Sequence, residues 1–161
     1  MNLIADSAKI SRLADLEESV RGSRIIIGEN CMVDSFVKFK FAGGLGDIVI
    51  GERCYINSGC VLYSGHGIRI GNKVLIASNC TLAPVNHGLD KGTTMLEQPH
   101  MKSKGGIVIG DDVWIGANSV ILDGAIIGKG CVIGAGSIVK GQLQEYGIYY
   151  GNPMVLHGYR K

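Results

Sequence analysis

Few side chains in this chain could carry acid–base or nucleophilic chemistry: there are four histidines and five cysteines among 161 residues. Histidine suits proton transfer because its ordinary pKa lies near neutrality. His87, within Asn86-His87-Gly88, and His100 both fall in a stretch that lacks the periodic pattern of the surrounding sequence. A lone loop histidine more often has no catalytic role. Whether His87 or His100 takes part in catalysis therefore depends on the structural elements that position its side chain.

The cysteines are better explained by packing. Their number is odd, and their spacings match neither a zinc site nor a disulfide framework. Free cysteine behaves as a small buried apolar side chain. Each one follows a large apolar residue of the repeat described below by four positions: Cys31, Cys54, Cys60, Cys80 and Cys131. We expect reduced, buried thiols and a cytoplasmic protein.

An apolar residue returns every six positions along most of the chain. A period of six fits neither a helix at 3.6 nor a simple strand at 2. It predicts short strands joined by tight corners, each sending one large side chain inward. Three strands would close a triangular coil, and six coils would stack into a solenoid. The six trios are Ile4, Ile10, Leu16; Ile27, Val33, Phe39; Ile50, Ile56, Leu62; Ile70, Ile76, Leu82; Ile109, Ile115, Ile121; and Ile127, Ile133, Val139.

The chain is expected to be a single all-β domain over residues 1–161, with coils at 4–139. An excursion loop at 83–106 would interrupt them, and a short cap at 140–161 would close them. A loop this long in a small domain is usually functional. The net charge of +2, with no basic stripe, argues against nucleic acid. No apolar run is long enough for membrane insertion, and the N-terminus does not resemble a signal peptide.

The hexads resemble those of the left-handed β-helix, hexapeptide-repeat acyltransferases, and residues 82–153 are similar to the sugar O-acetyltransferases of that family. The similarity rests on Asn86-His87-Gly88, on the tryptophan block at 109–118, on 132–137 and on Gly151-Asn152-Pro153. The resemblance implies a left-handed helix and a homotrimer with active sites between subunits. It also implies acetyl-CoA as co-substrate, no metal, and a sugar or saccharide acceptor, in surface polysaccharide biosynthesis.

The resemblance also implies roles for individual residues. His87 would be the general base that takes the proton of a sugar hydroxyl as it attacks the thioester. Asp90 or a backbone carbonyl could orient its ring, and backbone N–H groups from Trp114 to Gly116 could hold the oxyanion. The residues expected to bind the acceptor are Asn57, Asn86 and Trp114. The residues expected to bind the cofactor are Gly116, Ala117, Ala135, Lys140, Asn152 and Arg160.

Two positions limit this transfer of roles. Asn57 is explained equally well as an ordinary corner residue, since asparagine is a common turn former. In the tail, Val155 stands where the family usually has a basic residue. A contact to a CoA phosphate would then be missing, or supplied by Arg160 or Lys161.

Other functions fit the same fold. N-acetylation of an amino-sugar nucleotide and antibiotic acetylation stay open within the acetyltransferase class. A γ-class carbonic anhydrase needs three histidines around zinc, two of them five residues apart, but residue 92 is glycine. A non-catalytic scaffold would need neither the loop histidine nor the tryptophan block.

Overall fold

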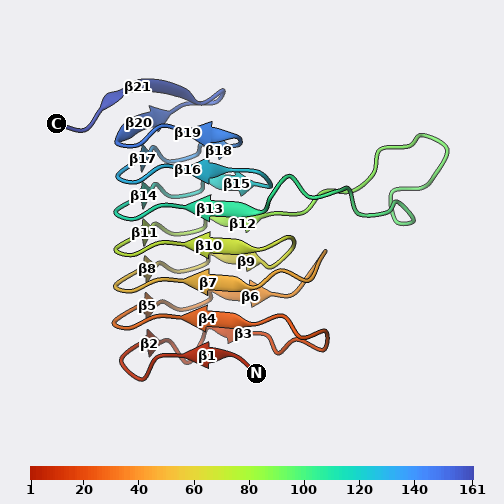
Figure 1. Ribbon diagram of the computed structural model, residues 1–161, viewed down its shortest axis with the longest axis horizontal. Helices are drawn as coiled ribbons and strands as arrows, with labels where there is room; N and C mark the ends of the chain where they lie inside the picture. Colours follow the sequence, from red (N-terminus) through yellow and green to blue (C-terminus); the bar gives the residue numbers. More distant parts are fainter.

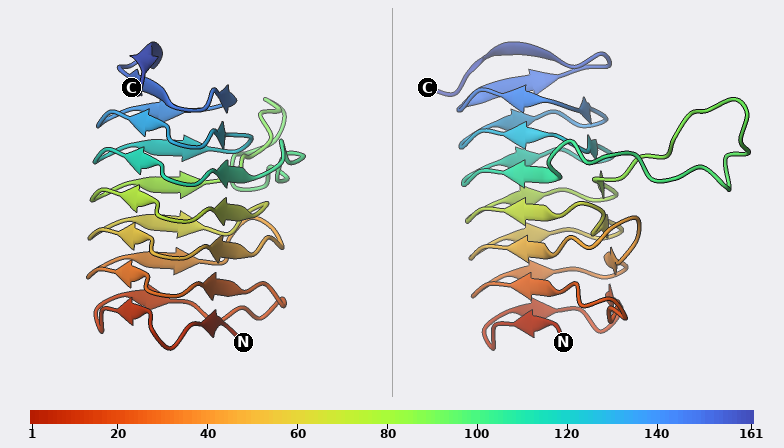
Figure 2. Two further views of the ribbon diagram at one scale, coloured as in Figure 1. Left: turned by 60° about the vertical axis from the view of Figure 1, so that its left-hand side comes forward. Right: turned by 45° about the vertical axis from the view of Figure 1, so that its right-hand side comes forward.

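The computed structural model covers residues 1–161 and folds the chain into a three-sided solenoid of short strands (Figures 1 and 2). Sheet A consists of β1 (Leu3–Ile4), β4 (Ile25–Ile27), β7 (Ile48–Ile50), β10 (Ile68–Ile70), β13 (Ile107–Ile109), β16 (Ile126–Ile127) and β19 (Gln142–Leu143). Sheet B consists of β2 (Lys9–Ile10), β5 (Met32–Val33), β8 (Tyr55–Ile56), β11 (Leu75–Ile76), β14 (Trp114–Ile115), β17 (Val132–Ile133), β20 (Gly147–Tyr150) and β21 (Val155–Tyr159). Sheet C consists of β3 (Asp15–Leu16), β6 (Lys38–Lys40), β9 (Val61–Tyr63), β12 (Thr81–Ala83), β15 (Val120–Leu122) and β18 (Ile138–Val139).

The hexad residues form the core, which confirms the predicted left-handed β-helix. In the second to sixth coils every inward residue of the repeat is buried. Parallel pairing stacks equivalent positions, so that Ile56 lies over Ile76 and Ile115 lies over Ile133. In the first coil Ile4 is exposed, because no coil covers that end of the solenoid.

The solenoid continues beyond the last hexad that the sequence pattern identified. β19 pairs with β16 and β20 pairs with β17, both in parallel, so two sides of a seventh coil follow Val139. Leu143 and Tyr149 are buried at the inward positions of these strands. β21 then pairs with β20 in the antiparallel direction and covers the end of sheet B.

The corners explain the glycines and the cysteines. A Cβ on Gly116 would lie 2.5 Å from the backbone nitrogen of Ala135 in the next coil, so only glycine lets the coils stack at this spacing. The five thiols are buried and unpaired, as expected. The Cys54 thiol donates to the carbonyl of Gly71 at 3.0 Å, and burial raises the pKa of Cys54 to about 12.

The segment between β12 and β13, residues 84–106, projects sideways from the solenoid, and we call it the arm (Figure 1). The arm has its own internal hydrogen bonds: the buried Gln98 side chain donates to the carbonyls of Asp90 at 2.5 Å and Thr93 at 3.0 Å. The structure contains no helix with the length and hydropathy needed to span a membrane.

Candidate active site

Most of the residues singled out in the sequence lie at three different corners of the solenoid. The A–B corner includes residues 110–113, the B–C corner includes residues 116–119, and the C–A corner includes the arm. Asn57, Gly116, Ala117 and Ala135 belong to the B–C corner. Asn86, His87 and Lys140 belong to the C–A corner. One protomer therefore does not bring the candidate base and the candidate cofactor corner together.

His87 is exposed near the base of the arm and faces His100 across an isolated antiparallel bridge. The centres of the two imidazole rings are 4.9 Å apart, and their planes are tilted by 44°. Asp90, one of the expected orienting partners, is used elsewhere: its carboxylate accepts the backbone N–H of Gly92 at 2.8 Å. The neighbour of the His87 ring is therefore His100, which sequence reasoning did not pair with it.

Two of the expected oxyanion donors already make hydrogen bonds within the chain. The N–H of Trp114 donates to the carbonyl of Cys131 at 3.0 Å, and the N–H of Gly116 donates to the carbonyl of Ile133 at 2.7 Å. Both N–H groups are therefore used in hydrogen bonds to the next coil and are not free to bind an oxyanion. The N–H of Ala117 has no acceptor within the chain, so it is the free donor nearest the expected place.

The B–C corner changes character along the solenoid axis. The position after the inward residue of sheet B is polar in the lower coils and small in the upper ones: Ser11, Asp34, Asn57, Ala77, Gly116 and Gly134. One residue further on, the N–H groups of Ala117 and Ala135 point to no acceptor in the chain. At these two positions the upper corner thus presents free backbone donors beside small side chains.

Asn57 makes the hydrogen bond expected of a corner residue and leaves one side-chain atom free. Its side-chain amide donates to the carbonyl of Ile76 at 2.8 Å, which is a structural corner bond. Its side-chain carbonyl accepts no hydrogen bond from the chain. Below it in the same column lies Asp34, whose carboxylate accepts the N–H of Ser35 at 2.7 Å and the hydroxyl of Ser58 at 2.8 Å. These two bonds, the backbone one first, lower the pKa of Asp34.

Asp34 is a candidate for binding hydroxyl groups of the acceptor, and the sequence analysis did not name it. The sequence could have indicated this residue, because Asp34 occupies the same place in its hexad as Asn57 does in the next coil. A carboxylate held in its charged form accepts hydrogen bonds from hydroxyl groups well.

Trp114 lies on the outer side of sheet B, in register with Leu75 and Val132, and is 48% exposed. Beside it is a cavity of about 340 Å³, which Lys73 and Arg160 also line. Arg160 itself is engaged: its guanidinium donates to the Asp112 carboxylate at 2.8 Å and to the carbonyl of Gly130 at 3.1 Å.

Lys140 and Asn152 do come together, in a cavity of about 420 Å³ beneath the C-terminal hairpin, with Leu122, Ile138 and Met154 among its walls. Lys140 makes no ion pair. Arg160 lies at the A–B corner and Lys140 at the C–A corner, so these two cofactor candidates are on different edges of the protomer.

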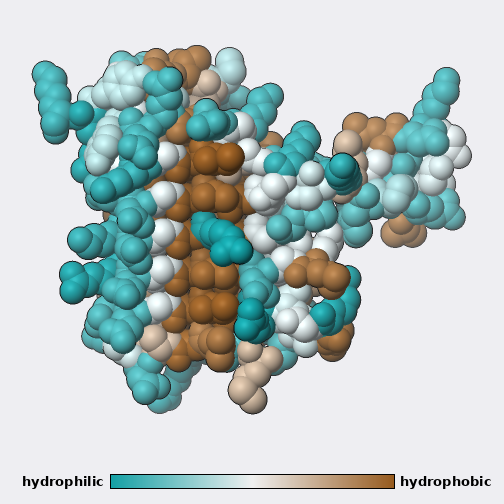
Figure 3. Space-filling view, viewed as in Figure 1, coloured by the Kyte–Doolittle hydropathy of each residue, from teal (hydrophilic) through white to brown (hydrophobic).

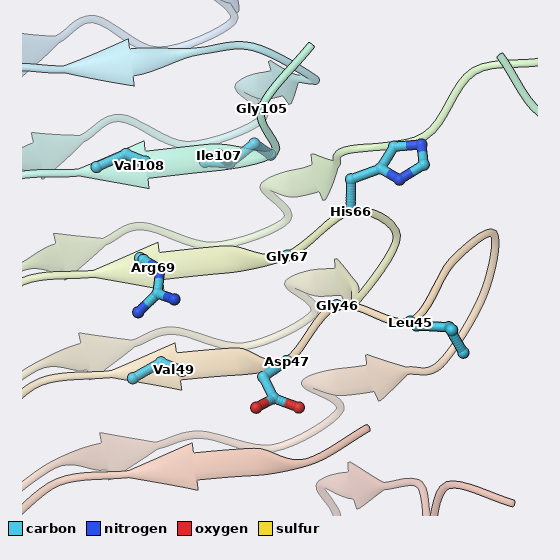
Figure 4. Close-up of a pocket in the computed structure, with 10 residues that line it drawn as sticks. All are labelled: Leu45, Gly46, Asp47, Val49, His66, Gly67, Arg69, Gly105, Ile107 and Val108. Carbon is cyan, nitrogen blue, oxygen red and sulfur yellow. The ribbon is translucent and has the colours of Figure 1, made fainter. Parts of the chain in front are cut away.

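A further cavity of about 240 Å³ opens at the C–A corner below the arm, where Asp47, His66 and Arg69 are among the residues around it (Figure 4). Asp47 is paired with Arg24 at 3.0 Å. The Nε2 atom of His66 is buried without a hydrogen-bond partner. No group of three or more histidine, cysteine or acidic side chains is placed to hold a metal.

Comparison with known proteins places these features in a family. The model of the bacterial transferase hexapeptide (six repeats) matches residues 106–141, and that of the hexapeptide repeat of succinyl-transferase matches residues 47–84. A galactoside O-acetyltransferase of Escherichia coli K12 is 35% identical over 147 residues, covering 89% of this chain and 68% of that protein. The chain belongs to the hexapeptide-repeat acyltransferase family. Together with the acetyltransferase relatives and the similar structures that hold CoA or acetyl-CoA, this makes it an acyl-CoA-dependent acetyltransferase.

Two other similar proteins are named for acyl transfer to different atoms. A second Escherichia coli K12 relative, whose name assigns it to lipopolysaccharide biosynthesis as an O-acetyl transferase, is 30% identical and covers 82% of this chain and 67% of that protein. A variant of an N-acyltransferase from Bacillus cereus has been solved with dTDP-4-amino-4,6-dideoxyglucose and coenzyme A. It superposes with a TM-score of 0.81 at 26% identity, covering 99% of this chain and 84% of that one. The hexapeptide-repeat fold thus serves both O- and N-acyl transfer.

Proposed function

We propose that this acetyltransferase moves an acetyl group from acetyl-CoA to a hydroxyl of a sugar or sugar-containing acceptor, in surface polysaccharide biosynthesis. The hydroxyl oxygen attacks the thioester carbonyl while His87 takes its proton. The carbon–sulfur bond then breaks, and the proton passes to the departing CoA thiolate. The free N–H of Ala117 is the candidate donor to the oxyanion that forms on the carbonyl oxygen.

The observation that carries this proposal is the division of the B–C corner. Its upper part, with Gly116, Ala117, Gly134 and Ala135, offers free N–H groups and no side chain beyond Cβ. An extended chain with amide carbonyls, such as the pantetheine arm of CoA, can lie close to such a surface. Its lower part offers the free oxygen of Asn57, which suits hydroxyl groups of an acceptor.

The separation of His87 from this corner supports an active site shared between protomers. The tip of the arm carries apolar side chains in solvent, with Leu96 95% and Leu89 81% exposed. Where exposed apolar side chains gather into a patch, they mark an interaction surface. We propose that the arm of one protomer reaches its neighbour, so that His87 faces the B–C corner of another copy.

Two sheet faces support a closed ring of protomers. On sheet A the outward column is apolar except at Arg69 and Gln142: Leu3, Ile26, Val49, Arg69, Val108, Ile126 and Gln142. Figure 3 shows this apolar stripe along the solenoid. Sheet B carries a second such column, Met32, Tyr55, Leu75, Trp114, Val132 and Ile148. A ring needs two different patches on each subunit, and we propose a homotrimer.

Transfer to an amino group is the second candidate, because the structurally similar Bacillus cereus enzyme is an N-acyltransferase solved with an amino-sugar nucleotide. The galactoside relative, at higher identity, favours the hydroxyl. We place the reaction in the cytoplasm, since five unpaired cysteines are consistent with a reducing compartment.

The deciding experiment is an acceptor screen with acetyl-CoA that reads the release of the CoA thiol. The panel pairs hydroxyl acceptors, such as galactosides and oligosaccharides, with nucleotide-linked amino sugars. The proposal expects turnover on hydroxyl acceptors, with an ester that mild alkali removes. Turnover on amino sugars alone, giving an alkali-stable amide, would assign N-acetylation instead.

A further inference from the structure

His87 and His100 form a cross-strand pair with a defined backbone geometry. The N–H of Gly88 donates to the carbonyl of Pro99 at 2.8 Å, and the N–H of Met101 donates to the carbonyl of Asn86 at 2.9 Å. These bonds flank the two histidines, which are thus a non-hydrogen-bonded antiparallel pair. In such a pair the side chains lie on one face and at their closest. Both residues are exposed.

The spacing of the rings is compatible with a metal ion held between them. Zinc lies about 2.0–2.1 Å from a histidine nitrogen, so each ring centre is roughly 3.2 Å from the metal. Two ring centres 4.9 Å apart then subtend an angle of about 100° at the metal, close to tetrahedral. Neither side chain makes a hydrogen bond within the chain, so nitrogen lone pairs on both rings are available.

We propose that His87 and His100 together bind a divalent cation of borderline softness, such as Zn²⁺ or Ni²⁺. Imidazole nitrogens suit these ions, whereas Mg²⁺ and Ca²⁺ prefer oxygen ligands. No third histidine, cysteine or acidic side chain joins the pair. Water would complete the coordination, so the site is reversible and differs from a buried structural zinc site, which uses four protein ligands.

The consequence for activity rests on the proposed function. A metal ion on His87 occupies a nitrogen lone pair that a general base needs to accept a proton. The site would therefore let zinc or nickel slow acetyl transfer, with His100 as the residue that makes His87 sensitive to the ion.

Calorimetric titration of the intact protein with Zn²⁺, Ni²⁺ and Mg²⁺ tests the site without any assay of activity. We expect about one zinc or nickel ion per chain and no binding of magnesium. His100→Asn should weaken binding roughly tenfold or more, because the second ligand no longer acts at high effective concentration. His157→Asn is the matched control: His157 is exposed but stacks on Tyr150, with ring centres 3.3 Å apart, far along the chain from the arm. The zinc affinity of the His157→Asn variant should equal that of the wild type.

Equal zinc affinity in wild type and His100→Asn would overturn the site, as would loss of binding in His157→Asn. Activity then gives a separate result. Zinc should inhibit the wild type at concentrations that fill the site, and His100→Asn, measured against its own metal-free rate, should resist. If zinc fills the His87–His100 site while acetyl transfer is undiminished, the metal site stands and the role of His87 as base is contradicted.

Discussion

Asp123 accepts the backbone N–H of Lys104 at 2.9 Å, which ties the returning end of the arm to the coil that follows. Its other carboxylate oxygen accepts the N–H of Gly106 at 3.0 Å. Asp123 is buried, and the two bonds fix where the chain re-enters the solenoid before β13. The position of the arm, and so of His87, depends on this anchor.

Replacing Asp123 by alanine should loosen the arm. Two backbone donors would lose their acceptor, and an unsatisfied buried donor costs about 1–3 kcal/mol. We expect a lower free energy of unfolding and a lower kcat, with acetyl-CoA binding retained because the B–C corner is untouched. Asp90→Ala is the control, since its carboxylate only accepts Gly92 N–H within the arm. Equal kcat in Asp123→Ala and wild type would contradict the anchoring role.

The cysteines should be unreactive toward thiol reagents in the native protein. Burial raises the pKa of Cys54 to about 12, so its thiol stays protonated when folded. All five thiols are buried, so at pH 8 a thiol reagent should label none of them rapidly, and all five after denaturation in guanidinium. Because the folded pKa lies above the unfolded value of about 8.5, the stability contributed by the protonated thiol is complete below that value. It is lost as pH rises toward 12. Rapid labelling of native Cys54 at pH 8 would contradict this packing.

Acetyl transfer should need no metal. Exhaustive dialysis against a chelator should leave kcat unchanged, or raise it if zinc had occupied the histidine pair. Activity that disappears on chelation and returns specifically with zinc would instead favour a metal-dependent reaction.

The shared active site can be tested with mixed trimers. His87→Ala removes the proposed base, and Ala135→Phe places a large side chain on the proposed cofactor surface. Each variant alone should form inactive homotrimers of about three times the monomer mass in light scattering. Co-expressed, each mixed trimer should regain one intact site, formed by His87 of one protomer and the cofactor corner of its neighbour. A mixture as inactive as its parents, or a protein that stays monomeric at micromolar concentration, would contradict the shared site.

The sequence predicted the solenoid well because a large apolar residue at every sixth position directly indicates which side chains are buried. Ile109, Ile115, Ile121, Ile127 and Ile133 follow one another at a spacing of six, and parallel pairing stacks Ile115 on Ile133. The seventh coil was missed because the step from Val139 to Leu143 breaks the spacing of six. Leu143 and Tyr149 resume it for two sides only.

The site was harder to predict, since its contacts join residues whose separation follows no period. The meeting of His87 and His100 depends on how the arm folds back around Gln98. The pairing of Arg160 with Asp112 spans 48 residues and depends on where β21 places the tail. Which N–H groups are free near Trp114 depends on the stacking of one coil on the next, which no local motif encodes.

The most direct test of the account is the turnover of His87→Ala on an acceptor that the wild-type enzyme acetylates. General-base assistance is worth about 10²–10⁴-fold in rate. We expect kcat to fall by about that factor while acetyl-CoA binding is nearly unchanged, and the limb of the pH–rate profile that a histidine base produces to disappear. His100→Ala and His157→Ala should lower kcat much less. Turnover of His87→Ala close to that of wild type would show that another group takes the proton.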